Sequence, residues 1–185
     1  MRDDLTVVKL GGSHALSPLL GPWLAAIGRA AGRIVVVPGG GPFADAVRAA
    51  QPAMGFDDAT AHDMALMAMA QYGRALCGLA AGFVYADTLA AVRDAVGVVP
   101  VWSPWPMLRG HPDIPRSWDV TSDSLAVWLA GALNAGRLVV IKHRSGGGEG
   151  LMDVAFPDFA ARFAGVVQVV GPDDLGVAAM LFGGG

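Results

Sequence analysis

The residues best suited to chemistry lie in three glycine-rich turns, each directly after an apolar, β-branched segment. The first turn is Gly11-Gly12-Ser13, the second is Gly39-Gly40-Gly41, and the third lies within residues 142–148. Glycine lets backbone N–H groups approach an anion without side-chain obstruction. A helix that begins just beyond such a turn adds unsatisfied N–H donors and the positive end of its dipole. Each turn alone fits a plain tight turn, but the three together favour a phosphate site.

Two lysines stand where such segments end. Lys9 precedes the first turn and Lys142 precedes the third. Lysine within an apolar strand is costly to bury without an anionic partner. Each ammonium could instead reach solvent from the strand end. Two lysines at one sheet edge favour polyphosphate binding over that alternative.

Asp123 precedes a strongly apolar stretch and has two interpretations. In the structural one, Thr121 or Ser122 caps a helix and Asp123 is an acid in its first turn, where it suits the dipole. In the functional one, Asp123 sits between Lys9 and Lys142 and holds them in orientation. It could also help to position Mg²⁺, which phosphoryl transfer usually requires.

Other chemistries find little support. The glycine spacing matches neither the Walker P-loop nor the dinucleotide-binding pattern. The histidines fit no zinc spacing, and the single cysteine excludes an intrachain disulfide framework and a cysteine-based zinc site. Among the histidines, His62 is the one we expect to contact a substrate, because it stands beside Asp63 near a predicted helix start.

Short β-branched runs alternate with alanine- and leucine-rich segments, as in βα units around a mostly parallel sheet. The runs are almost continuously apolar, which favours strands covered by helices on both faces. In such α/β sheets, loops at the carboxyl ends of the strands bind ligands. The predicted strands are Thr6–Leu10, Arg33–Val37, Phe83–Ala86, Val98–Trp102, Leu138–Lys142 and Val166–Val170. The predicted helices are Pro18–Ala31, Pro42–Ala50, Asp58–Ala81, Leu89–Ala95, Ser122–Ala135, Pro157–Phe163 and Asp173–Leu181.

Two segments predict further features. The helix expected at Asp58–Ala81 carries methionines and leucines around several faces, so we expect it to be deeply buried or pressed against a second subunit. This predicts a homodimer or a higher homo-oligomer. Residues 102–118, the tryptophan loop, hold three tryptophans and too many prolines for regular structure, and long ordered loops of this kind are often functional.

Composition limits the remaining possibilities. With 185 residues the chain has room for one domain, or at most two very small ones, and its 54% hydrophobic residues exclude disorder. A net charge of −3 argues against nucleic acid as a partner, since there is no basic excess to displace counterions. Prolines and glycines interrupt the longest uncharged stretch, so we expect no membrane span. The N-terminal residues 1–4 are acidic and lack a signal-peptide pattern, so we expect a cytoplasmic location.

The motifs VVKLGGS (7–13), VVVPGGGPFADAVR (35–48) and VTSDSLAVWLAGAL (120–133) before LVVIKH resemble the amino acid kinase superfamily. AHDMALMAMAQYG (61–73) and WDVTSDSLA (118–126) resemble its [5-(aminomethyl)furan-3-yl]methyl phosphate kinase branch of methanofuran biosynthesis. The likeness covers residues 1–142, about three quarters of the chain.

The resemblance implies a three-layer αβα sandwich and ATP-dependent phosphoryl transfer with Mg²⁺, to an acceptor that already bears a phosphate. Lys9 would bridge the donor and transferring phosphates, and Asp123 would organise the lysines. By this resemblance Gly11, Gly12 and Ser13 would line the ATP phosphates, and Gly39, Gly40 and Gly41 would hold the phosphate of the acceptor. We further expect Arg144 to contact the ATP phosphates, and His62 and Ser122 to contact the acceptor.

The third turn and the C-terminal part depart from the superfamily pattern. Only 43 residues follow Lys142, and Arg144-Ser145-Gly146-Gly147-Gly148 stands where many relatives have an aspartate-containing turn. Lys142 or Arg144 would then supply the second cation, and Asp153 the missing acid. The alternative is a catalytically silent homologue that binds a ligand or serves as an assembly subunit. A third alternative is a carboxylate acceptor, which would give an acyl phosphate.

Overall fold

The computed structural model describes residues 2–145 and 150–182. Within these residues one all-parallel sheet has the strand order β3-β4-β2-β1-β5-β6. The predicted strands are all present, with ends shifted by up to four residues. Their bounds are Arg2–Leu10 (β1), Ile34–Pro38 (β2), Phe83–Ala86 (β3), Val99–Trp102 (β4), Ala135–Ile141 (β5) and Val166–Val170 (β6).

The helices follow the predicted segments with three differences. The first predicted helix is shorter and follows a 3-10 turn, the last one also begins as a 3-10 turn, and a short helix interrupts the tryptophan loop, which was predicted to be irregular. The bounds are Gly12–Leu16 (η1), Leu20–Gly28 (α1), Gly41–Met54 (α2), Asp58–Leu79 (α3), Leu89–Asp94 (α4), Trp105–Leu108 (α5), Ser122–Leu133 (α6), Phe156–Ala160 (α7), Pro172–Val177 (η2) and Ala178–Phe182 (α8).

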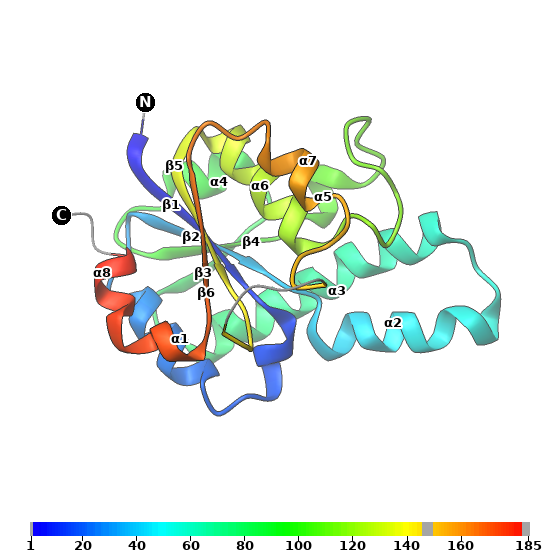
Figure 1. The fold of residues 1–185 in the computed structure, drawn as a ribbon, viewed down its shortest axis with the longest axis horizontal. Helices are drawn as coiled ribbons and strands as arrows, with labels where there is room; N and C mark the ends of the chain where they lie inside the picture. The colour runs from blue at the N-terminus through cyan, green and yellow to red at the C-terminus, as the bar shows by residue number, and fades with distance from the viewer. Residues whose placement is uncertain (1, 146–149, 183–185) are drawn as a thin grey trace.

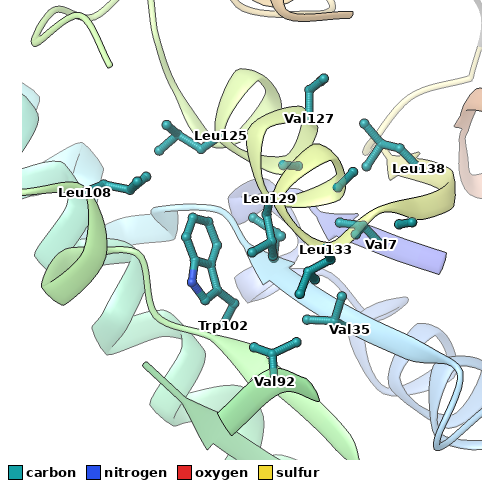
Figure 2. Close-up of a cluster of buried hydrophobic side chains, with 14 of the residues drawn as sticks. Val7, Val35, Val92, Trp102, Leu108, Leu125, Val127, Leu129, Leu133 and Leu138 are labelled. Atoms are coloured by element: carbon teal, nitrogen blue, oxygen red, sulfur yellow. The ribbon is translucent and has the colours of Figure 1, made fainter. Parts of the chain in front are cut away.

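Helices cover both faces of the sheet, so the fold is a three-layer α/β sandwich (Figure 1). Side chains alternate along each strand, and therefore Val7 packs into one core while Val8 packs into the other. The first core lies between the sheet and α4, α5, α6 and α7, with Trp102 and the leucines of α6 at its centre (Figure 2). The second core lies under α1, α8 and the C-terminal part of α3.

The helices α2 and α3 run as an antiparallel pair beyond the edge of the sheet (Figure 1). Gly55 ends α2 in the left-handed conformation with a φ of 76°, and the side chain of Asp57 caps α3 by accepting from the N–H of Thr60 at 2.8 Å. The buried side chains of α3 include Leu66, Met69 and Leu76, whereas Met67 and Leu79 are 37% and 63% exposed. The methionine-rich helix is thus only partly buried in this chain.

The central strand β1 lies between β2 and β5, where the strand order reverses. Lys9 is the penultimate residue of β1 and is paired in register with Val37 of β2 and Val140 of β5. Lys142 directly follows β5, and its N–H donates to the carbonyl of Val170 at 2.8 Å. Both lysines therefore reach the carboxyl edge at the switch point, the usual ligand site of such sheets.

Candidate active site at the carboxyl ends of the strands

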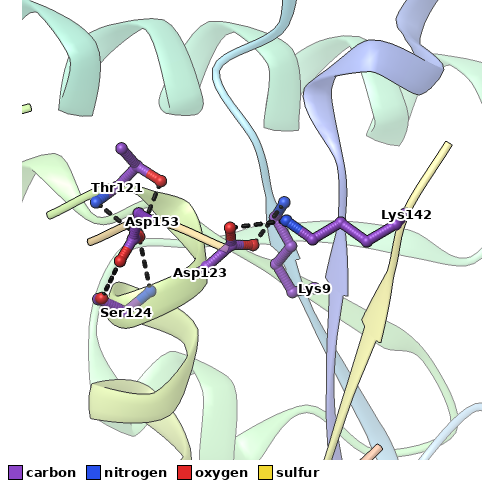
Figure 3. A network of polar contacts seen from close by, with 6 residues as sticks. All are labelled: Lys9, Thr121, Asp123, Ser124, Lys142 and Asp153. Atoms are coloured by element: carbon purple, nitrogen blue, oxygen red, sulfur yellow. Dashed lines mark hydrogen bonds and ion pairs between the residues drawn. The ribbon is translucent and has the colours of Figure 1, made fainter. Parts of the chain in front are cut away.

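The two lysines converge on one carboxylate (Figure 3). The Nζ atom of Lys9 lies 2.8 Å from Oδ1 of Asp123, and Nζ of Lys142 donates to Oδ2 at 2.7 Å. Asp123 is the second residue of α6, whose N-terminus faces the ends of β1 and β5. The chain contains no lysine besides these two, its other 11 basic residues being arginines. Both lysines of the chain therefore belong to this cluster.

The cluster is buried and carries one unit of excess positive charge. The exposed fractions of Lys9, Asp123 and Lys142 are 5%, 4% and 8%. Burial alone would raise the pKa of Asp123, but the two ammonium groups outweigh it and the pKa is lowered. Burial lowers the pKa of Lys142, as does repulsion from Lys9, while Asp123 opposes both. A further anion would balance the remaining charge.

The first two glycine turns pack directly against each other at this edge. A Cβ atom on Gly12 would lie 2.7 Å from the Cα of Gly41, and one on Gly39 would lie 2.9 Å from the Cα of Gly12. Gly41 also has a φ of 56°, which favours glycine. Contact between the two backbones therefore requires glycine at these positions.

The N–H groups of the two turns fall into two sets. Gly11 donates to the carbonyl of Ile141 at 3.2 Å, and Gly39 donates to that of Leu10 at 2.9 Å, so both are already used within the fold. The second set comprises the N–H groups of Gly12, Ser13, Gly40 and Gly41. Within the described residues, none of these four donates to a backbone carbonyl. This second set stands at the N-termini of η1 and α2 and can donate to an anion.

A cavity of about 280 Å³ opens between these turns, α3 and the start of α6. It brings together seven of the site residues expected from the sequence, namely Lys9, Gly12, Ser13, Gly40, Gly41, His62 and Ser122. It also contains residues that the sequence did not single out as site residues, namely Asp45, Arg48, Met69, Trp118 and Thr121, although Met69 and Trp118 belong to the methionine-rich helix and the tryptophan loop. The walls are therefore cationic and rich in N–H groups at the strand ends, and aromatic and apolar farther along α2 and α3.

The third turn is only partly described. Gly146, Gly147 and Gly148 lie outside the described residues. Arg144 is exposed and does not line the cavity, so the structure does not bring it to the other site residues. Of the two cations considered for the second position, only Lys142 contacts Asp123.

Asp153, which the sequence suggested as the missing acid of the third turn, contacts the start of α6 in the structure. Its carboxylate accepts from the N–H and the hydroxyl of Thr121, each at 2.8 Å, and from the N–H of Ser124 at 3.0 Å, and it also contacts the Ser124 hydroxyl. Thr121 occupies the N-cap of α6, but its side chain donates to Asp153 instead of capping the helix. Asp153 therefore caps α6 from a distant loop and fixes the helix that presents Asp123 (Figure 3).

The end of the tryptophan loop closes the far side of the cavity. The indole N–H of Trp118 donates to Gln51 at 2.7 Å, and the guanidinium of Arg48 lies 4.5 Å from its ring centre. Nδ1 of His62 lies 3.2 Å from the carbonyl oxygen of Ser117. We call the part lined by Arg48, His62 and Trp118 the distal end. Gly41 and Arg48 are seven residues apart in α2, a rise of about 10 Å.

His14 is a buried group that sequence reasoning left unused. It is 1% exposed, and in the described part of the chain neither ring nitrogen has a hydrogen-bond partner. Burial lowers its pKa, and the nearby positive charge of Lys9 lowers it further. The sequence feature that could have pointed to His14 as a site residue is its position two residues after Gly11-Gly12.

Two features are absent from the described residues. They contain no group of three or more His, Cys, Asp or Glu side chains arranged to hold a metal ion. They also contain no helix both long enough and apolar enough to span a bilayer.

One curated protein is similar in sequence. It is the [5-(aminomethyl)furan-3-yl]methyl phosphate kinase of Methanocaldococcus jannaschii, 27% identical over 139 residues. The match covers 72% of this chain and 63% of that enzyme, so the chain spans slightly less than two thirds of its relative. No protein-family model matches the chain.

Several solved kinases share the fold. The uridylate kinase of Archaeoglobus fulgidus superposes with a TM-score of 0.72 at 14% identity, covering 94% of this chain and 95% of that one. The UMP kinase of Bacillus anthracis gives 0.70 at 15% identity, covering 97% and 91%. The chain therefore has the fold of these uridylate kinases, which confirms the predicted α/β fold, and its sequence is similar to that of a phosphate kinase, as the motifs predicted.

Proposed function

We propose that this protein is an ATP-dependent kinase that transfers the γ-phosphoryl group to a small acceptor bearing a phosphate. The observation that carries the proposal is the pair of buried lysines on Asp123, beside a cavity rimmed by unused N–H groups. The first candidate acceptor is [5-(aminomethyl)furan-3-yl]methyl phosphate, after the relative's printed name. The product would be the corresponding diphosphate.

In the proposed reaction, an oxygen of the acceptor phosphate forms a bond to the γ-phosphorus while the bond from the γ-phosphorus to the β,γ-bridging oxygen breaks. The electron pair of that bond leaves with ADP. Such reactions depend on positioning and charge stabilisation, with little covalent chemistry by the protein. Mg²⁺, carried by the nucleotide phosphates, would supply further positive charge.

The roles of the charged residues follow from their positions. Lys9 lines the cavity and would stabilise the transferring phosphoryl group, which gains charge on its equatorial oxygens. Lys142 would stabilise the donor side, next to the third turn. Asp123 would hold both ammonium groups in place, because it contacts each within 2.8 Å.

The N–H groups of the glycine turns have separate roles in the proposal. Those of Gly40 and Gly41, at the start of α2, would hold the acceptor phosphate. Those of Gly12 and Ser13, at the start of η1, would contact the ATP phosphates. Ser122, at the start of α6, lines the cavity and would contact the acceptor.

The test is ADP release from MgATP with a panel of phosphomonoesters that includes the furanmethyl phosphate. We expect ADP in proportion to acceptor consumed and a diphosphate product detectable by phosphorus NMR. A parallel carboxylate panel tests for acyl phosphate formation. Absence of ADP release with every phosphomonoester would contradict the proposal.

A silent, ligand-binding homologue is the second candidate. It is favoured by the position of Arg144, which is exposed and outside the cavity. Calorimetry separates the two functions, because a silent homologue would bind a phosphomonoester without binding MgATP. The kinase must bind both.

A further inference from the structure

The strand β6 forms an open edge of the sheet (Figure 1). Among the described residues, the backbone hydrogen bonds of β6 go to β5 and to the residue that follows β5. Two of its side chains, Val166 and Val169, are 64% and 42% exposed. An edge strand with free backbone groups and exposed apolar side chains is a template for pairing with another strand.

The register with β5 shows which backbone groups of β6 are free. The N–H of Lys142 donates to the carbonyl of Val170 at 2.8 Å, so Val170 directs its backbone groups towards β5. Neighbouring residues of a strand direct their backbone groups to opposite sides. The N–H and C=O groups of Val167 and Val169 therefore point away from the sheet, where they can bond to a further strand.

The sequence of β6 is complementary to itself. It is Val-Val-Gln-Val-Val, which reads the same in both directions and carries no charge. A twofold axis at Gln168 would place Val167 opposite Val169 of a second, antiparallel copy. These are the residues with outward backbone groups, so each outward N–H meets an outward carbonyl. The two Gln168 side chains would face each other, and each amide can both donate and accept.

We propose that β6 pairs with β6 of a second copy of this chain, antiparallel and about a twofold axis at Gln168. The two sheets then form one continuous sheet, with six strands from each copy. A twofold contact uses the same surface on both subunits, so the assembly closes as a dimer. The inference goes beyond the proposed function, and it assigns the contact to a surface other than the methionine-rich helix.

Exposed apolar side chains beside the strand would add to this contact. Side chains alternate along β6, so Val166 and Val169 lie on opposite faces of the sheet. Arg137 is paired in register with Val166 and donates to the carbonyl of Leu181 at 2.9 Å, which places α8 beside the start of β6. Met180 of α8 is 71% exposed. Pairing of two copies would therefore cover apolar surface as well as backbone.

The opposite edge of the sheet is less suited to such pairing. Its strand, β3, has the sequence Phe-Val-Tyr-Ala, which is not symmetric. The guanidinium of Arg74 lies 3.6 Å from the ring centre of Tyr85 in this strand, and Arg74 is exposed. Two copies joined at β3 would bring these charges towards each other, and charged groups at an edge strand oppose pairing.

The first experiment locates the contact by disulfide cross-linking. Cys77, the one cysteine of the chain, is replaced by alanine, and single cysteines are placed at Gln168, at Val84 in β3 or at Met67 in α3. Across the proposed axis the Cα atoms of residue 168 would lie about 4.5 Å apart, a distance that a disulfide spans.

We expect Gln168→Cys to form a covalent dimer under mild oxidation about tenfold faster or more than the two controls, because its thiols alone would be held within bonding distance. Cross-linking of Val84→Cys or Met67→Cys at the same rate as Gln168→Cys, or faster, would overturn the inference.

The second experiment breaks the pairing. Val169→Pro removes an outward N–H, leaves the bonds to β5 in place and puts its ring between the two strands, and proline is tolerated at such edge positions. Val169→Thr keeps the N–H and is the matched control. By light scattering we expect the mass of one chain, 18.9 kDa, for Val169→Pro and twice that mass for Val169→Thr and the native protein.

Urea unfolding shows whether Val169→Pro is folded. If it is not, Gln168→Lys takes its place, because it sets like charges opposite each other across the axis, and it should also give the mass of one chain. A native protein of one chain, or a folded Val169→Pro or Gln168→Lys protein that stays dimeric, would overturn the inference. Both experiments are read without ATP or acceptor, so they succeed or fail independently of the kinase proposal.

Discussion

The buried carboxylate of Asp123 balances the charge of one of the two ammonium groups, and it is the anion that both of them contact. Asp123→Asn keeps the shape of the side chain but leaves Lys9 and Lys142 facing each other without an anion. Breaking a buried ion pair on one side typically costs about 3–5 kcal/mol. We expect a loss of this order in the free energy of unfolding, measured in urea.

Asp113→Asn, on an exposed loop, is the matched control and should unfold like the native protein. Inorganic pyrophosphate should stabilise Asp123→Asn more than the native protein, because it supplies the missing negative charge. Equal urea midpoints for Asp123→Asn and Asp113→Asn would contradict the ion-pair account.

Two buried histidines give the protein a predictable response to acid. Burial lowers the pKa of both His14 and His62 below 6.5, with Lys9 and His143 near the first ring and Asp63 and Arg116 near the second. Below pH 6.5 the unfolded chain therefore binds protons that the folded chain does not. Stability should fall as the pH drops from 6.5 towards the folded-state pKa values.

Urea unfolding at several pH values measures how steeply the free energy of unfolding falls with pH. His14→Gln and His62→Gln should each make the dependence of the unfolding free energy on pH shallower between pH 6.5 and 5. A native protein whose stability does not change across this range would contradict the buried, neutral state of both rings.

The two glycine turns work as one element because their backbones touch. An alanine Cβ at Gly12 would press on the backbone of Gly41, which cannot rotate away as a side chain could. We expect Gly12→Ala to destabilise the fold by about 1–3 kcal/mol, as overpacking does, and to weaken phosphate binding by separating the turns.

Gly78→Ala is the control, since a Cβ there meets no atom within 4 Å and the residue lies in α3. It should stabilise the protein by about 1 kcal/mol through helix propensity. Thermal unfolding and phosphate titration measure both variants. A Gly12→Ala protein as stable as Gly78→Ala would show that the turns do not depend on each other.

Local sequence pattern was enough to predict the elements that present the site. The strands are apolar runs of the right length, and the lysines and glycines follow them directly, so their convergence at one edge is a consequence of parallel topology. The cap on α6 was not predictable in this way. Asp153 is 32 residues from Thr121, and no local pattern specifies that contact.

The distal end was also beyond local reasoning. Arg48, Gln51 and Trp118 meet only because the tryptophan loop folds back across α2 and α3. His62 was singled out by its position beside Asp63, but its bond to Ser117 depends on the same long-range fold.

At the scale of the whole molecule, the one-domain organisation and the homo-oligomer remain predictions. The helix pair α2 and α3 extends beyond the sheet, and Met54 and Met67 are exposed on it, at 73% and 37% (Figure 1). Light scattering at micromolar concentration should give at least twice the 18.9 kDa mass of the chain. A mass of one chain would contradict the prediction.

We propose that the lysine–aspartate cluster at the strand ends promotes the transfer of a phosphoryl group from ATP. The most direct test is the initial rate of ADP release from MgATP and the furanmethyl phosphate by the native protein, Lys9→Met and Arg33→Met. Arg33 is an exposed basic residue just before β2, at the opposite edge of the sheet. We predict that Lys9→Met lowers kcat about 100-fold or more while remaining folded, and that Arg33→Met keeps the native rate. A Lys9→Met protein that turns over at the native rate would contradict the account.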